Sequence, residues 1–140
     1  MIEKDVIQSK LRHLQEYLED LAEYRGITLS NYRTSKKDQR FVERTLHLAC
    51  ECCIDIAAHL VSRKALRAPK DNKDLFSVLH ENGIISAPVG AAMTKMAQFR
   101  NIVVHDYTRI DPEIVIGILR SGVDDLKKFA AEILDFLGTH

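Results

Sequence analysis

The segment from Arg100 to Tyr107 concentrates four side chains that can act on a phosphate ester: Arg100, Asn101, His105 and Tyr107. Histidine can take up and release a proton near neutral pH. Arginine binds phosphate oxygens through a two-pronged charged contact and stabilises the extra negative charge of a phosphorane. Asn101 can orient either group. This set suits metal-free cleavage of RNA, in which a base activates the ribose 2′-hydroxyl for attack on the adjacent phosphate, a route closed to DNA.

The spacing of Arg100 and His105 constrains how they could act together. Five residues along an ideal helix place two side chains about 140° apart around its axis, so the pair would not share a face. Three arrangements would bring both to one substrate: the helix loosens before His105, the long arginine side chain bends, or a second copy of the chain completes the site across a dimer. The β-branched residues 102–104 between them weaken the helix locally.

Apolar residues recur at helical spacing along nearly all of the 140-residue chain. The spacing predicts five helices: one ending near Gly26, one over 38–63, a short one over 73–82, one that begins at the cap Ser86, and one over 112–137. Residues 31–37 are expected to form a loop or a helix start. No segment shows the alternation of a strand. We expect a single all-α domain over residues 1–140, an up-and-down bundle of four to five helices.

Local signals place several of the predicted helix ends. Gly83 is a natural C-terminal stop. Ser86 and Asp111 are caps, and Pro88 and Pro112 follow them in the first turn, where a missing N–H does no harm. Gly122 lies on or near the apolar stripe of the last predicted helix, where it could permit close approach of a neighbouring helix.

The charge balance excludes a protein that coats nucleic acid by bulk electrostatics, because twenty Lys and Arg match twenty Asp and Glu. It allows one local phosphate site. Residues 64–73 form a basic stretch that either guides RNA or is simply a solvated loop, and the chain from Asp111 onward is mainly acidic. No apolar run is long enough for a membrane span, and no secretory signal begins the chain, so we expect a cytoplasmic protein.

Cys50, Cys52 and Cys53 do not fit a disulfide framework or a zinc site, because their number is odd and their spacing lacks a second pair. We interpret them as small buried hydrophobes in a helix.

Glu51, Asp55 and His59 recur every four residues and so form a stripe on the same predicted helix. The stripe is consistent with a metal site, part of an RNA cleft, or a solvated face or buried polar network at a dimer interface. We favour the last reading and expect no metal. Asp55 lies in an otherwise apolar stretch and is expected to face the helix that carries Arg100.

Residues 100–107 resemble the Arg-x4-His-x-Tyr motif of HepT-like toxins, which belong to the HEPN superfamily of helical ribonucleases. The resemblance covers nearly the whole chain and also includes residues 41–44, 51 with 54–60, 75–76 with 79, 83–85 and 96–99. Asp106 stands where relatives often carry glycine. This difference alters the turn after His105 and places a carboxylate beside the presumed base.

The resemblance implies an endoribonuclease toxin that needs no cofactor and acts as a homodimer, with the two motifs facing a shared cleft. Arg100 and His105 match the catalytic pair, Asn101 matches the polar residue that follows the arginine, and Asp55 and Asp106 are possible cleft residues. The implied partner is a minimal nucleotidyltransferase antitoxin (MntA-like), which transfers AMP from ATP onto the motif tyrosine, here Tyr107. The added phosphate and base would block and repel RNA near His105.

Two other functions are consistent with the same residues. The chain could be a non-catalytic HEPN module that binds nucleotide or serves as the regulatory partner of a minimal nucleotidyltransferase. It could also be a purely structural bundle, in which case changes at Arg100 and His105 would affect stability alone.

Overall fold

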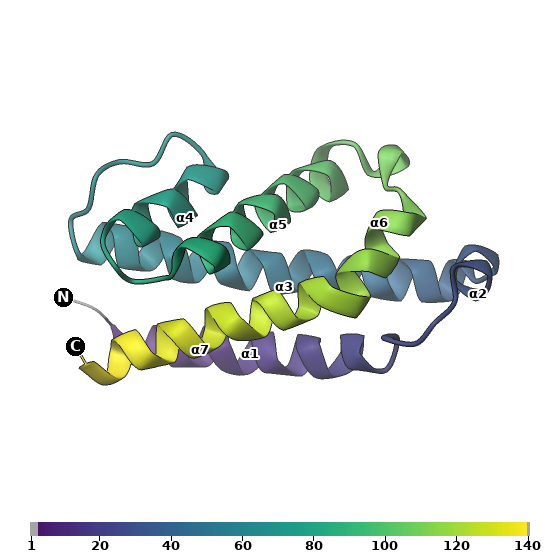
Figure 1. Cartoon of the computed structure of the whole chain (residues 1–140), viewed down its shortest axis with the longest axis horizontal. Helices are drawn as coiled ribbons and strands as arrows, with labels where there is room; N and C mark the ends of the chain where they lie inside the picture. The colour runs from purple at the N-terminus through teal and green to yellow at the C-terminus, as the bar shows by residue number, and fades with distance from the viewer. Residues whose placement is uncertain (1–2, 140) are drawn as a thin grey trace.

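The computed structural model describes residues 3–139, and every regular element in that range is helical (Figure 1). The elements are α1 (Lys4–Ala22), α2 (Leu29–Thr34), α3 (Lys36–Arg63), α4 (Asn72–Glu81), α5 (Ala87–His105), the 3-10 turn η1 (Tyr107–Arg109), α6 (Pro112–Gly117), the π-helical turn η2 (Ile118–Gly122) and α7 (Val123–Thr139). The four long helices α1, α3, α5 and α7 alternate in direction along the bundle, and the shorter α4 packs on α3 and α5. The predicted all-α up-and-down architecture is confirmed.

The core forms because each long helix buries one apolar stripe. In α1 the buried side chains step by four and three residues: Ile7, Leu11, Leu14, Leu18 and Leu21. Helix α3 lies at the centre, contacts α1, α2, α4 and α5, and is buried over most of its circumference. By length and composition α3 could also cross a membrane, but 61% of its most apolar window is buried inside the bundle.

The three cysteines are buried within α3, as predicted from their number and spacing. Burial raises the pKa of the Cys50 thiol to about 12 and that of Cys53 well above its usual range. A thiol held in its neutral form is a poor nucleophile and a poor metal ligand. These residues therefore act as packing groups.

The first two predicted helix boundaries need correction. Helix α1 ends at Ala22, four residues before Gly26. Of residues 31–37, expected to form a loop or a helix start, 31–34 belong to the short helix α2. Helix α3 begins at Lys36, two residues before the predicted start. The reason is local capping, because the Thr28 and Ser35 hydroxyls each accept a hydrogen bond from the backbone N–H three residues later, both at 3.1 Å.

The helix signals at Gly83, Ser86 and Asp111 are confirmed. Gly83 has a positive φ of 71°, and the N–H groups of Gly83 and Ile84 each bind carbonyls of the last turn of α4 at 3.0 Å. The Ser86 hydroxyl accepts from the N–H of Val89, and the Asp111 carboxylate accepts from that of Glu113. These caps fix where α5 and α6 begin.

The helix predicted over 112–137 is not a single α-helix. Its second turn widens into the π-helical segment Ile118–Gly122 before α7 continues. A Cβ atom added to Gly122 would lie 3.0 Å from Cγ2 of Ile118, in the same widened turn. Gly122 therefore accommodates the π-turn, which corrects the expectation that it serves contact with a neighbouring helix.

Candidate functional site

Helix α5 remains helical as far as His105 and ends only at Asp106, whose φ of −152° and ψ of 55° leave the helical region. The N–H of Asp106 still binds the carbonyl of Ile102, at 2.8 Å. The β-branched residues do not break the last turn, because it continues from a long, well-packed helix. Of the three arrangements considered for Arg100 and His105, loosening of the helix between them is thus excluded.

Arg100 is directed toward α3 and is held by two acceptors. Its Nε–H donates to Oε1 of Glu51, and one Nη1–H donates to Oδ1 of Asn101 at 3.2 Å. Only 19% of the arginine side chain and 30% of the Glu51 side chain are exposed. A guanidinium has five N–H donors, and within residues 3–139 two of them make hydrogen bonds.

Two further side chains of α3 extend this contact. Nε2 of His47 lies 3.4 Å from Oε1 of Glu51, and Nη1 of Arg44 lies 3.3 Å from Nδ1 of His47. Because arginine can only donate, Nδ1 of His47 accepts and the ring proton lies on Nε2, the nitrogen nearer to Glu51. We refer to Arg44, His47, Glu51, Arg100 and Asn101 as the α3–α5 polar cluster.

The prediction that Asp55 faces the helix of Arg100 is wrong. The Asp55 carboxylate instead accepts a hydrogen bond from Lys10 on α1 at 3.0 Å, and this contact raises the pKa of Lys10. The carboxylate that reaches α5 belongs to Glu51, one turn earlier. Further along the same stripe, Nε2 of His59 accepts from the N–H of Glu3. The three residues of the stripe, Glu51, Asp55 and His59, thus contact different neighbours. Nowhere in residues 3–139 do three His, Cys, Asp or Glu side chains lie close enough together to hold a metal.

His105 and Tyr107 lie on the solvent side of the α5 terminus, next to the partly exposed apolar residues Ile102 and Val104. Tyr107 is 71% exposed, on the short turn η1. The Asp106 carboxylate accepts from Oγ1 of Thr108 at 3.2 Å and from Arg109 at 3.4 Å. Within the described range no hydrogen bond or ion pair joins Asp106 to His105, so the turn after α5 directs that carboxylate to Arg109 rather than to the presumed base.

The basic stretch 64–73 lies at the other end of the bundle, where α3 ends and α5 begins (Figure 1). The guanidinium of Arg67 is bound by Asp74 and Glu81 at 2.8 to 3.0 Å. Lys64 lies 5.3 Å from the ring centroid of Phe136. The positive charge of this loop is therefore partly compensated, and the loop is remote from Arg100 of the same chain.

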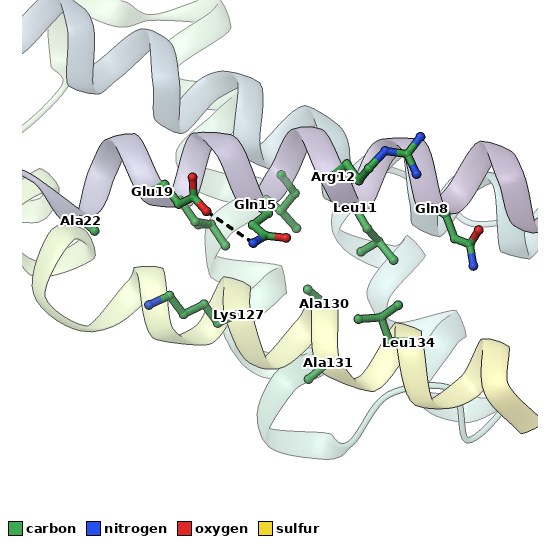
Figure 2. Close-up of a pocket in the computed structure, with 12 residues that line it drawn as sticks. Gln8, Leu11, Arg12, Gln15, Glu19, Ala22, Lys127, Ala130, Ala131 and Leu134 are labelled. Atoms are coloured by element: carbon green, nitrogen blue, oxygen red, sulfur yellow. Dashed lines mark hydrogen bonds between the residues drawn. The ribbon is translucent and has the colours of Figure 1, made fainter.

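A groove of about 680 Å³ between α1 and α7 is not the candidate site (Figure 2). Its lining is mainly apolar and includes Leu11, Leu14 and Ala130, together with the charged residues Arg12, Glu19 and Lys127. Its lining contains no histidine, so it lacks a group that could transfer a proton near neutral pH. The chemistry-bearing side chains lie instead along α5 and the facing part of α3.

Sequence reasoning proposed Arg100, Asn101, His105 and Tyr107 and named Glu51 as part of a polar stripe, but it did not connect the α3 members of the polar cluster with Arg100. Arg44, His47 and Glu51 form a narrow polar stripe on an otherwise apolar helix. Such a stripe is the signal that could have identified them, because polar groups on a largely buried helix require partners.

Comparisons with known proteins show the family of the chain. A family model described as Ribonuclease HepT-like matches residues 14–133. The chain is 30% identical to the mRNA nuclease HepT of Shewanella oneidensis, over 89% of this chain and 93% of that protein. It is 27% identical to the tRNA nuclease HepT of Aphanizomenon flos-aquae, over 99% and 94%.

A solved structure of the tri-AMPylated Shewanella oneidensis HEPN toxin in complex with MNT antitoxin superposes with a TM-score of 0.85. The sequences are 28% identical, and the match covers 94% of this chain and 98% of that chain.

Proposed function

The chain belongs to the HepT-like ribonuclease family, and from this membership we propose that it is a metal-independent endoribonuclease toxin. The observation that carries the proposal is the guanidinium of Arg100, which Glu51 and Asn101 hold in place on the helix that ends at His105. Its action would be cytoplasmic, and an antitoxin that transfers AMP to Tyr107 would neutralise it.

The proposed chemistry follows from these groups. A His105 imidazole removes the proton from a ribose 2′-hydroxyl, and the oxygen attacks the adjacent phosphorus. The Arg100 guanidinium binds the non-bridging oxygens and stabilises their charge in the transition state. Asn101 keeps the guanidinium oriented through the 3.2 Å contact. A protonated imidazole returns a proton to the departing 5′-oxygen, which leaves a 2′,3′-cyclic phosphate.

We propose that the active form is a homodimer with both motifs at one cleft. Arg100 faces α3 while His105 is exposed, so one protomer does not present both groups on one face of α5. A second copy can supply the missing imidazole. The exposed apolar side chains Ile102 and Val104 beside His105 support a contact there, because such groups gain by being covered.

Tyr107 is the proposed site of neutralisation. Its side chain is 71% exposed and two residues from His105, so a nucleotidyltransferase can reach its hydroxyl. AMP on that oxygen adds a negative charge and a bulky base beside the imidazole, and it would exclude RNA by charge and by volume. The AMPylated relative in complex with MNT antitoxin supports this assignment and a minimal nucleotidyltransferase partner.

The test is cleavage of total RNA by the purified protein with a metal chelator present. We expect cleavage to persist with chelator and to end in cyclic phosphates. His105→Ala and Arg100→Ala should each abolish it, while His13→Ala, at an exposed histidine of α1, should not. Cleavage that survives both motif substitutions would reject the assignment. A tight complex with the antitoxin but no RNA loss and no AMP transfer would favour the non-catalytic module.

A further inference from the structure

Glu51 binds Arg100 at the one nitrogen that fixes the orientation of its guanidinium. The contact is made to Nε, which lies inside the side chain, rather than to the two terminal Nη groups. A carboxylate at Nε sets the plane and rotation of the group. Of the terminal groups, Nη1 also contacts Asn101, and the remaining Nη donors can bind a phosphate.

Glu51 is itself held in place from α3. Nε2 of His47 lies 3.4 Å from the same oxygen, Oε1, and the guanidinium of Arg44 lies 3.3 Å from Nδ1 of His47. Arg44 and His47 therefore surround the carboxylate from the same helix. A long side chain supported in this way has fewer conformations to lose when substrate binds.

Packing of α3 against α5 does not depend on this ion pair. Directly beside it, Cys50 and Met96 are buried and in contact, with the thiol 3.9 Å from the Met96 carbonyl oxygen. Ala97 is also buried on this side of α5. Since apolar burial already joins the two helices, a partly exposed charged pair adds little to stability.

We propose that Glu51 is a positioning residue for catalysis, which acts on RNA cleavage only through Arg100. This inference rests on the proposed ribonuclease function. Glu51 does not touch RNA; it holds the guanidinium where charge develops in the transition state. Its removal should therefore lower the rate of the chemical step more than it weakens substrate binding.

The first experiment compares Glu51→Ala, Glu51→Gln and the wild-type protein by steady-state cleavage of a short RNA. We expect Glu51→Ala to lower kcat by roughly 10- to 100-fold with KM changed by no more than about twofold. Glu51→Gln keeps an acceptor of the same length without the charge, so it should recover part of the loss. The matched control is Asp124→Ala, which removes a two-pronged carboxylate–arginine pair with Arg25 and should leave both constants unchanged.

A double-substitution cycle tests whether Glu51 acts through Arg100. Lysine lacks the Nε–H donor of arginine within its side chain. In an Arg100→Lys background, Glu51→Gln should therefore lower kcat by no more than about twofold. An equal loss in both backgrounds would overturn the proposal.

A spectroscopic readout keeps the test independent of activity. The Arg100 Nε–H signal in a ¹H–¹⁵N spectrum should be sharp and slowly exchanging in the wild type and should lose this protection in Glu51→Ala. An unchanged Arg100 Nε–H signal in Glu51→Ala would overturn the proposal. This readout does not require Arg100→Lys to be active. Failure here is distinct from failure of the proposed function, which would appear as full activity in His105→Ala and Arg100→Ala.

Discussion

Arg100 and His105 lie on one uninterrupted helix, α5, about 140° apart around its axis. Arg100 turns inward to Glu51 on α3, whereas His105 is exposed at the end of the helix. A continuous helix cannot bring the two side chains to one face, so their cooperation requires either a bent arginine or a second chain. Because Arg100 is already held by Glu51 and Asn101, a second chain is the simpler route.

The dimer proposal predicts that two inactive variants restore activity when they share a dimer. If each site takes Arg100 from one protomer and His105 from the other, a mixed dimer of Arg100→Ala and His105→Ala keeps one intact site of two. Random pairing makes half of the dimers mixed, so the co-refolded mixture should regain about a quarter of wild-type cleavage. The measurement is RNA cleavage before and after co-refolding of the two variants.

Each variant refolded alone is the control and should remain inactive. If the mixture also stays inactive while mixed dimers are present by mass, then Arg100 and His105 act within one chain. In that case the guanidinium must leave Glu51 during the reaction.

Tyr107→Phe should separate cleavage from neutralisation. The hydroxyl is not required by the proposed chemistry, so we expect kcat within about twofold of the wild type. Without the hydroxyl, the antitoxin and ATP should add no AMP, and the variant should remain active. Intact protein mass after incubation with the antitoxin measures the first outcome, and residual RNA cleavage measures the second.

Tyr17→Phe provides the matched control, since this tyrosine lies on α1 and is only partly exposed. It should be modified like the wild type. Mass increments of AMP that persist in Tyr107→Phe would place the acceptor on another residue.

The sequence is sufficient to predict most of the helices, because their positions follow from local rules. Apolar spacing places α1, α3, α4 and α5, and the caps Ser86 and Asp111 mark two starts correctly. The π-turn before α7 is different. The residues before and after the π-turn each keep the apolar spacing of a helix, so the sequence pattern predicts one continuous helix across Gly122.

The candidate site could be predicted only in part, for a geometric reason. The residues of the motif segment are adjacent along one helix, so spacing alone brings Arg100 and Asn101 together. Their partner on α3 depends on how that helix is rotated between α1 and α5. Glu51 and Asp55 differ by one turn, yet the first meets Arg100 and the second meets Lys10. The rotation of α3 about its axis is set by the packing of whole helices, and the spacing of residues along one helix does not encode it.

Arg67 should stabilise the protein at neutral pH and lose this effect in acid. Its hydrogen bonds lower the pKa of Asp74 and of Glu81, with help at Asp74 from the backbone N–H of Lys70. A carboxylate whose folded pKa is depressed contributes stability above its unfolded pKa, near 4, and loses it as pH falls further. Arg67→Ala should therefore be less stable than the wild type at pH 7, and the difference should shrink below about pH 4.

Urea unfolding of both proteins at pH 7, 4 and 3 measures this difference. Arg33→Ala is the control, because its nearest carboxylate partner, Glu113, is 3.8 Å away. Its effect on the free energy of unfolding should be small and should not vary with pH. A difference for Arg67→Ala that grows toward acid would contradict the assigned pairing.

Two glycines five residues apart should respond oppositely to alanine. At Gly117, in α6, an added Cβ meets nothing within 4 Å, so Gly117→Ala should stabilise the helix by about 0.5–1 kcal/mol. At Gly122 the same atom would lie 3.0 Å from Cγ2 and 3.3 Å from Cβ of Ile118. The Cβ of Ile118 cannot rotate away, so Gly122→Ala should destabilise by about 1 kcal/mol or more. Denaturant unfolding measures both changes, and stabilisation by both would show that the π-turn does not require glycine.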